Sequence, residues 1–213
     1  MSAATRPAAA RDPEATRERI LAAALAEFAD KGLAGARVDA IARRARINKR
    51  MLYHYFGNKA DLFREILRRQ VAARAAAIAE APGPLGEFLA YFYEVACRDL
   101  EWVRLLKWEA LEADPKRVAA EAERRAAFRA AVAKIRRGQT QGQLPPDLDP
   151  RQCLLALLGL TAFPLAFPQI ARLITGRTPT DPVFVRERMR FLRRFAGHLA
   201  STRPARLNGR GRT

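Results

Sequence analysis

The chain has 213 residues, 49% of them hydrophobic, which is enough for a sizeable core in one domain or two small ones. Its net charge of +17 favours a polyanionic partner, although 33 arginines against 6 lysines also fit a bias toward GC-rich codons. An enzyme, a metalloprotein and a disulfide-stapled fold are disfavoured. There are only two histidines, the two cysteines lack metal-ligand spacing, and no nucleophile or phosphate-loop motif occurs. We therefore expect no catalytic residue, no metal and no cofactor.

The first predicted element is a helix that follows an arm rich in Ala, Pro and Arg over residues 1–12. The arm lacks the apolar core of a signal peptide, and we expect it to be disordered. The helix is predicted to begin at Asp12-Pro13, an N-cap followed by proline at N1, or at Thr16. Gly32 is expected to end it. Its apolar stripe comprises Ile20, Leu21, Ala24, Leu25 and Phe28.

Residues 38–59, VDAIARRARINKRMLYHYFGNK, predict two short helices joined by a tight turn. The first has one apolar face, made of Val38, Ile41, Ala42 and Ala45. Arg46 lies in the turn, where a left-handed backbone would destabilise any residue other than glycine. Asn48 is expected to cap the second helix.

The second helix has two different faces. Leu52 and Phe56 point toward the first helix, whereas Arg50 and His54 point away from it. Cations interleaved with Met51 and tyrosines are typical of a DNA-binding face. Cations meet phosphate and guanine, and a thioether or a ring meets the thymine methyl or a sugar. The alternative is a helix whose tyrosines and methionine pack on a neighbouring element.

Lys59 lies at the first position of the next predicted helix, with Asn58 as N-cap and Asp61 at N3 as in a capping box. The helix dipole disfavours a cation there, but a phosphate bound at that helix start would reverse the sign of the effect. The alternative is an ordinary exposed lysine.

Residues 16–66 resemble the N-terminal DNA-binding domain of the TetR family of bacterial transcriptional regulators. The resemblance rests on TRERILAAALAEFADKG, on the pair Ile41-Ala42, and on LYHYFGNKADLF. It implies a three-helix DNA-binding head, a helical body that binds a ligand and forms a dimer, and repression relieved by a small molecule.

The chain departs from the family pattern at three places. Arg37 and Val38 stand where a Ser or Thr usually caps the second helix and touches phosphate, and Arg37 is expected to replace that contact. Arg46 replaces the usual turn glycine, and the bulky Arg50 and Met51 replace the usual small residue before the Leu-Tyr pair. These departures leave the operator sequence open.

The predicted DNA contacts divide into two groups. Those expected to hold phosphates are Arg37, Tyr53, Tyr55 and Lys59. Those expected to meet base edges are Lys49, Arg50, Met51 and His54, and Val38 and Asn48 complete the predicted interface. Two such heads would enter successive major grooves of double-stranded DNA about 34 Å apart, at a near-palindromic operator. This geometry predicts a homodimer.

A fourth helix is predicted from Lys59 to about Glu80, and Pro82-Gly83-Pro84 separates a DNA-binding domain, 13–81, from a helical body, 82–201. The body lacks strand-like alternation, so the fold is predicted to be all-α. Its helices are predicted near 85–99, 101–113, 115–141, from 150 onward, and 182–200. Residues 202–213 are expected to form a basic disordered tail.

The helix from residue 150 is apolar nearly all round and must therefore be buried on every side. A partner subunit is the expected cover, and a central core helix of a monomer is the alternative. Pro164 and Pro168 are expected to bend or divide this helix. They also interrupt the apolar run 153–171, so we expect no membrane span and a cytoplasmic protein.

The body has aromatic residues that are able to line an apolar ligand pocket, although each also fits simple core packing. The candidates are Phe92, Trp102, Trp108, Glu109, Phe128, Phe163 and Phe167. The sequence thus predicts a sequence-specific DNA-binding transcriptional regulator, a repressor released from its operator by a small apolar or amphipathic ligand. The alternatives are an activator of the same fold and a protein that binds DNA without sequence preference.

Overall fold

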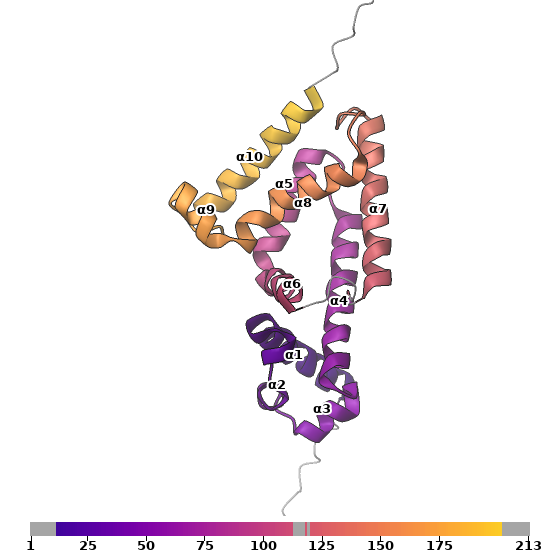
Figure 1. The fold of residues 1–213 in the computed structure, drawn as a ribbon, viewed down its shortest axis with the longest axis vertical. Coiled ribbons are helices and arrows are strands. Elements are labelled where there is room, and N and C mark those ends of the chain that lie inside the picture. The colour runs from indigo at the N-terminus through magenta and orange to yellow at the C-terminus, as the bar shows by residue number, and fades with distance from the viewer. Residues whose placement is uncertain (1–11, 113–117, 119, 202–213) are drawn as a thin grey trace, which may run out of the picture. The chain divides into compact units, whose positions relative to one another are not determined.

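The computed structural model describes residues 12–112, 118 and 120–201. These residues form ten α-helices and no β-strand, so the all-α prediction is confirmed (Figure 1). The predicted N-terminal arm, apart from Asp12, and the predicted C-terminal tail lie outside the described residues.

The described residues form two compact units. The first unit takes its residues from 1–70 and 104–120, and the second from 71–103 and 121–213. The helices are α1 Pro13–Gly35, α2 Val38–Ala45, α3 Lys49–Phe56, α4 Lys59–Glu80, α5 Leu85–Arg98, α6 Leu100–Glu112, α7 Glu121–Thr140, α8 Pro150–Ala166, α9 Pro168–Thr175 and α10 Pro182–Ser201. The predicted domain boundary at Pro82 stays a prediction.

The ends of α1 follow from local chemistry. The Asp12 carboxylate accepts hydrogen bonds from the N–H groups of Glu14 and Ala15 at 3.0 and 3.3 Å, which satisfies two donors that the helix leaves free. Gly32 interrupts the helix with a φ of 68°, as glycine permits, and one further turn then runs to Gly35. The predicted cap is confirmed, and the helix is broken at Gly32 as predicted, with a short helical segment after it.

The core of the first unit joins α1 to α2, α3 and α4. Phe28 of α1 is fully buried and meets the ring of Phe63 of α4 edge to face, with 5.0 Å between ring centroids. The other large buried side chains are aliphatic residues from all four helices: Ile20, Ile41, Leu52, Leu62 and Leu67. This core fixes the position of α3, whose outer face is therefore presented on a rigid base.

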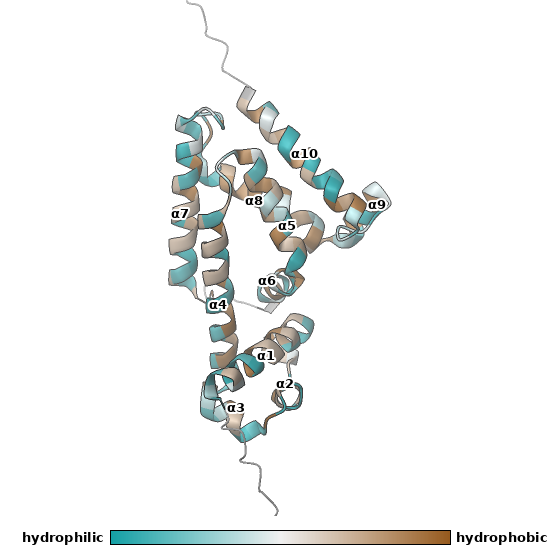
Figure 2. Cartoon of the chain, turned by 180° about the vertical axis from the view of Figure 1, so that it is seen from behind, coloured by the Kyte–Doolittle hydropathy of each residue, from teal (hydrophilic) through white to brown (hydrophobic). Residues whose placement is uncertain are grey.

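In the second unit, α5 packs against both α8 and α10, and α7 packs against α8. Gly86 of α5 makes the approach of α10 possible, because a Cβ there would lie 3.0 Å from the Cα of Arg193. Tyr93 of α5 is fully buried, and its hydroxyl donates a hydrogen bond of 2.9 Å to the carbonyl of Pro179. Figure 2 shows that α8 is largely hydrophobic, whereas α7 and α10 carry both kinds of residue.

The predicted start of the seventh helix at Pro115 is wrong for the described part of that segment. Val118 is not helical, and Ala120 has a φ of 52°, which no residue of a right-handed helix adopts. The helix begins instead at Glu121, where Glu121 and Glu123 place negative charge in its first turn. Pro115 itself lies outside the described residues.

The apolar segment from residue 150 is divided, as its prolines predict. Pro164 lies inside α8, Pro168 opens α9, and the two helices meet at an angle of 87°. Within the described part of the chain, no single helix has both the length and the apolar character needed to span a bilayer. Only α8 and α9 counted together, despite this bend, reach that length and apolar character.

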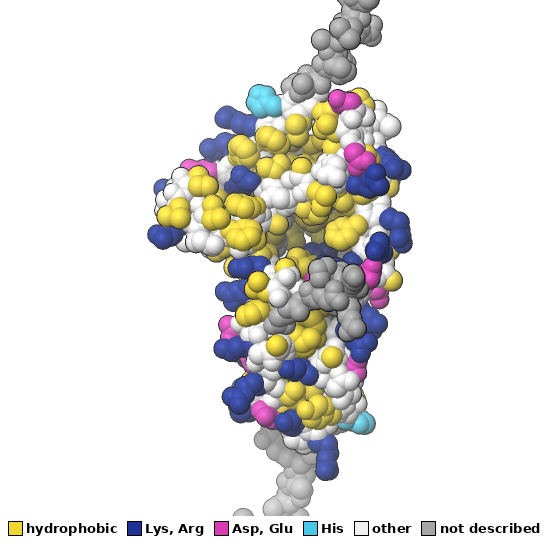
Figure 3. All heavy atoms as spheres, viewed as in Figure 1, with side chains coloured by type: hydrophobic (Ala, Val, Ile, Leu, Met, Phe, Trp, Pro, Cys, Tyr) yellow, Lys and Arg dark blue, Asp and Glu magenta, His cyan; other side chains and the backbone are white. Residues whose placement is uncertain are grey.

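A set of large apolar side chains on α8, α9 and α10 remains exposed. We call these residues the α8–α10 surface: Leu155, Leu158, Phe163, Phe167, Ile170, Leu173, Ile174 and Phe191. Leu155 is 62% exposed, and Leu173 and Ile174 are 78% and 77% exposed. Figure 3 shows hydrophobic side chains gathered over this part of the second unit. The described residues of the chain therefore cover α8 only in part, in contrast to a central core helix.

Candidate nucleic-acid interface

The turn between α2 and α3 closes with a regular helix-ending motif. The N–H of Ile47 bonds to the carbonyl of Ala42 at 3.0 Å, and the N–H of Arg46 bonds to the carbonyl of Arg43 at 3.1 Å. This is the Schellman pattern, which places Arg46 in the left-handed region, at φ 57° and ψ 46°. Asn48 then caps α3 by accepting a hydrogen bond of 2.8 Å from the N–H of Met51, as predicted.

The two faces of α3 differ as the sequence pattern predicts. Leu52 is fully buried and Phe56 is 8% exposed. On the opposite side, Arg50 and His54 are exposed, and Tyr53 is 41% exposed. This placement leaves the polar side chains accessible to a groove of DNA, and the contacts themselves stay predictions.

Two of the predicted contact residues on α3 are half-buried and not fully exposed. Met51 and Tyr55 both lie at the edges of the outer face, so each divides its surface between protein and solvent. The rings of Tyr55 and His54 meet nearly at right angles, with centroids 5.8 Å apart. The interpretation that these side chains pack on neighbouring residues thus accounts for part of their surface.

Lys49 forms an ion pair that sequence analysis missed. Its ammonium lies 3.1 Å from the carboxylate of Asp39 on α2, and this hydrogen bond raises the pKa of Lys49 above its ordinary value. The two side chains are 49% and 60% exposed, so the pair contributes little to stability. A phosphate or a base edge is therefore able to replace Asp39 as the partner of Lys49 with little loss of free energy.

The start of α2 presents the next two predicted contacts. The backbone N–H of Arg37 donates to a carboxylate oxygen of Glu27 at 3.2 Å, so an α1 side chain satisfies the donor just before α2. The guanidinium of Arg37 is exposed and has no polar partner among the described residues. Val38, the first residue of α2, is half-buried beside it.

Lys59 does more than the sequence predicts. Its ammonium donates hydrogen bonds of 3.2 Å to the carbonyls of both Ala34 and Ala36, at the end of α1. Asn58 caps α4 as predicted, accepting from the N–H of Asp61 at 2.9 Å. The Asp61 carboxylate returns the contact to the side-chain amide of Asn58, at 2.6 Å, and not to its backbone as in a capping box. Whether Lys59 also binds a phosphate stays a prediction.

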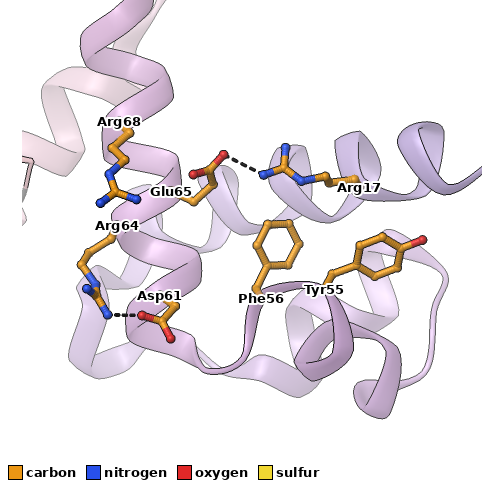
Figure 4. A pocket seen from close by; sticks show the side chains of 7 residues that line it. All are labelled: Arg17, Tyr55, Phe56, Asp61, Arg64, Glu65 and Arg68. Carbon is orange, nitrogen blue, oxygen red and sulfur yellow. Dashed lines mark hydrogen bonds and ion pairs between the residues drawn. The ribbon is translucent and has the colours of Figure 1, made fainter.

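A shallow open hollow of about 300 Å³ lies beside the C-terminal end of α3 (Figure 4). The residues that line it carry both signs of charge: Arg17, Tyr55, Phe56, Asp61, Arg64, Glu65 and Arg68. Arg17 bridges it, with its guanidinium 2.8 Å from Glu65 and 5.3 Å from the centre of the Phe56 ring. Carboxylates that line it pair with two of its three arginines, Arg17 with Glu65 and Arg64 with Asp61, so the hollow keeps an excess of only one positive charge.

The seven predicted ligand-pocket residues are divided between the two units. Trp108 and Glu109 belong to the first unit, and Phe92, Trp102, Phe128, Phe163 and Phe167 belong to the second. Phe163 and Phe167 are 45% and 43% exposed and lie on the α8–α10 surface, with 5.2 Å between ring centroids. Phe128 is 47% exposed on α7. The pocket stays a prediction.

The remaining two aromatic candidates of the second unit have partners outside the predicted set. Phe92 packs on Phe88, with centroids 4.8 Å apart, and Trp102 lies under the guanidinium of Arg74 at 5.6 Å. A hollow of only about 30 Å³ lies near Phe88 and Lys134, and none of the seven candidates lines it. It has room for little more than one water molecule.

Comparison with known proteins identifies both parts of the chain. Residues 20–66 match the family model described as "Bacterial regulatory proteins, tetR family". Residues 84–195 match the model described as "Tetracyclin repressor-like, C-terminal domain".

Individual relatives agree with the family models. The HTH-type transcriptional repressor SCO4008 of Streptomyces coelicolor is 36% identical over 168 residues, covering 79% of this chain and 88% of the relative. The HTH-type transcriptional repressor NicS of Pseudomonas putida is 33% identical over 109 residues, which is 48% of this chain and 51% of the relative. The solved structure of transcriptional regulator SCO4942 of Streptomyces coelicolor is 29% identical and covers 86% of this chain and 97% of that one, with a TM-score of 0.72. The chain belongs to the TetR family of bacterial regulatory proteins, whose members are DNA-binding transcriptional regulators.

Proposed function

We propose that this chain is a repressor that binds a near-palindromic operator as a homodimer and leaves the DNA when a small molecule binds its body. The observation that carries the proposal is the outer face of α3, where Arg50 and His54 are exposed while Leu52 anchors the opposite face in the core. The names of two relatives, both transcriptional repressors, support repression. The site of action is then the cytoplasm, where the bacterial chromosome lies.

In this proposal, α3 enters the major groove and the flanking residues hold the backbone. Lys49, Arg50, Met51 and His54 meet base edges, because all four lie on or beside the outer face of α3. Val38 and Asn48, at the starts of α2 and α3, complete the interface. Phosphates are bound by the predicted set Arg37, Tyr53, Tyr55 and Lys59.

The α8–α10 surface supports a homodimer. Large apolar side chains that stay exposed together on one face are typical of contact sites in soluble proteins. An operator with two half-sites also needs two heads about 34 Å apart. Leu155, at 62% exposed, is a direct probe of this surface. Leu155→Glu should give monomers in sedimentation velocity and lose operator binding. The matched control is Leu148→Glu, on an exposed leucine outside the surface, which should remain dimeric. A dimeric Leu155→Glu protein would exclude this interface.

The test of sequence-specific binding is a selection of bound fragments from random DNA and from the upstream region of the chain's own gene. Arg50→Ala should relax the base preference at one position of each half-site and weaken binding by about 1–3 kcal/mol. Arg136→Ala, at an exposed arginine of α7, is the control and should leave the preference unchanged. Equal binding to random and selected DNA would instead support a protein without sequence preference.

The effector is proposed to be small and apolar or amphipathic, and its pocket to involve some of the seven predicted residues of the body. Thermodynamic linkage gives a test that needs no prior identity. Any compound that lowers operator affinity must bind the DNA-complexed protein more weakly by the same factor, and coupling of about 1–3 kcal/mol, or about 5–150-fold, is expected. Transcription in vitro from a promoter that carries the operator distinguishes repression from activation. A repressor lowers the amount of transcript, and an activator raises it.

A further inference from the structure

Arg46 occupies a backbone position that glycine fits best. It is the residue after α2 in the Schellman motif, with φ at 57°. Four of the six described residues with positive φ are glycines: Gly32, Gly57, Gly142 and Gly176. Only Arg46 and Ala120 are not. A residue with a Cβ is strained in this region, so the arginine makes the turn less stable than glycine would.

The fold gains little in return from the Arg46 side chain. The side chain is exposed, and its guanidinium has no hydrogen-bond or ion-pair partner within the described ranges. A cation does suit the negative end of α2, but Arg43 and Arg44 already provide two in its last turn. The stabilisation of a helix end by a cation is also smaller than the strain energy of a left-handed residue other than glycine. Folding alone therefore does not explain an arginine at this position.

The position of Arg46 along the chain suggests a use outside the fold. It precedes Asn48, the N-cap of α3, by two residues. In a helix-turn-helix protein the N-terminal residues of the second helix contact base edges, while the first helix crosses the DNA backbone. The turn between them is thus placed at the edge of the groove, where phosphates lie. A guanidinium binds a phosphate through two parallel hydrogen bonds.

We propose that Arg46 binds a DNA backbone phosphate at the edge of the groove that α3 enters, and that the strained turn is retained for this contact. The inference rests on the proposed function and adds a phosphate contact outside the predicted set of DNA-binding residues. It also accounts for the departure at the turn, since a glycine there would relax the backbone and remove the charge together.

The test is Arg46→Gly, which should change stability and DNA binding in opposite directions. The midpoint of thermal unfolding should rise by about 2–4 °C as the strain is removed. The salt dependence of operator binding should become less steep. One phosphate contact fewer in each of two heads lowers the slope of log K against log salt by about 1.8. Between 50 and 200 mM salt, the unmodified protein should then lose about 12-fold more affinity than the variant.

Two further variants separate strain from charge. Ala120→Gly relieves a left-handed residue of the same kind without removing a cation, so it should leave the salt slope unchanged. Arg46→Lys keeps both the strain and the charge, so it should keep the slope of the unmodified protein.

An Arg46→Gly protein with an unaltered salt slope would overturn the proposed contact, while intact operator preference in the same experiment would leave the proposed function standing. An unmodified protein with no operator preference would refute the proposed function itself. A midpoint that fails to rise in Arg46→Gly would overturn the claim that the turn is strained.

Discussion

Replacing Lys59 by methionine should destabilise the DNA-binding head, because the ammonium joins two helix ends. It lies at the first position of α4, where the helix dipole disfavours a cation, and donates to Ala34 and Ala36, whose carbonyls lie at the negative end of α1. Lysine near a helix C-terminus stabilises the last carbonyls in this way. Lys59→Met keeps most of the length of the side chain and removes only the donor.

The expected loss follows from the geometry of the two hydrogen bonds. A bond to a charged group contributes about 1.5–3 kcal/mol when it is short and shielded. Both contacts of Lys59 are 3.2 Å long, at the upper end of the normal range, and the side chain is half-buried. Removal of the unfavourable dipole interaction returns a few tenths of a kcal/mol. We expect a net loss of about 1–2 kcal/mol, or roughly 2–8 °C in the midpoint of thermal unfolding.

Calorimetry of Lys59→Met beside Lys31→Met provides the measurement and its control. Lys31 is exposed and, among the residues that the structure describes, forms a single ion pair, with Asp30 at the surface. Its replacement should therefore change the midpoint little. A Lys59→Met midpoint equal to that of the control would refute the structural role of the ammonium. In the same proteins, a salt slope of operator binding that falls by about 1.8 for a dimer would show that Lys59 also binds phosphate.

Two further predictions concern buried and paired groups. Tyr93→Phe should cost about 1–2 kcal/mol in urea unfolding, because the carbonyl of Pro179 loses its buried donor, whereas Tyr91→Phe at a half-buried ring should cost less. Glu65 accepts a hydrogen bond from Arg17, which lowers the pKa of its carboxyl below the ordinary 4.5. The contribution of the ionised Glu65 carboxylate to the free energy of unfolding is therefore complete above pH 4.5. It is lost as the pH falls through the lowered pKa. Urea midpoints measured across this acid range should fall less steeply for Glu65→Gln.

The parts of the head that the sequence predicts well are those governed by neighbouring residues. The bounds of α2, the turn at Arg46 and the Asn48 cap all depend on contacts within about five residues. The two faces of α3 follow from helical periodicity, because Leu52 and Phe56 are spaced to meet the core together. Local propensity and hydrophobic pattern agree here, so little is left for tertiary structure to decide.

The contacts that sequence analysis missed join residues far apart in the chain. The ammonium of Lys59 finds carbonyls 23 and 25 residues earlier, and carbonyl groups leave no trace in side-chain identity. Asp39 and Lys49 are ten residues apart on different helices, so no spacing rule for a single helix connects them. The predicted start of α7 failed for a related reason, since proline and a charged residue suit a helix start equally well and Ala120 gives no sign of its positive φ.

Two groups of arginines in the head differ in their polar partners. Arg17 and Arg69 pair with carboxylates across α1 and α4, and Arg64 pairs with Asp61 within α4. Of these three, Arg17 also lies over the ring of Phe56 on α3. Another five guanidinium groups have no polar partner among the described residues, and they belong to Arg37, Arg43, Arg44, Arg46 and Arg50. All five lie on α2, on α3 or next to them, so their mutual repulsion acts against the folded head. A bound polyanion removes that repulsion, which is why a surface that is unfavourable in the free protein suits a DNA-binding one.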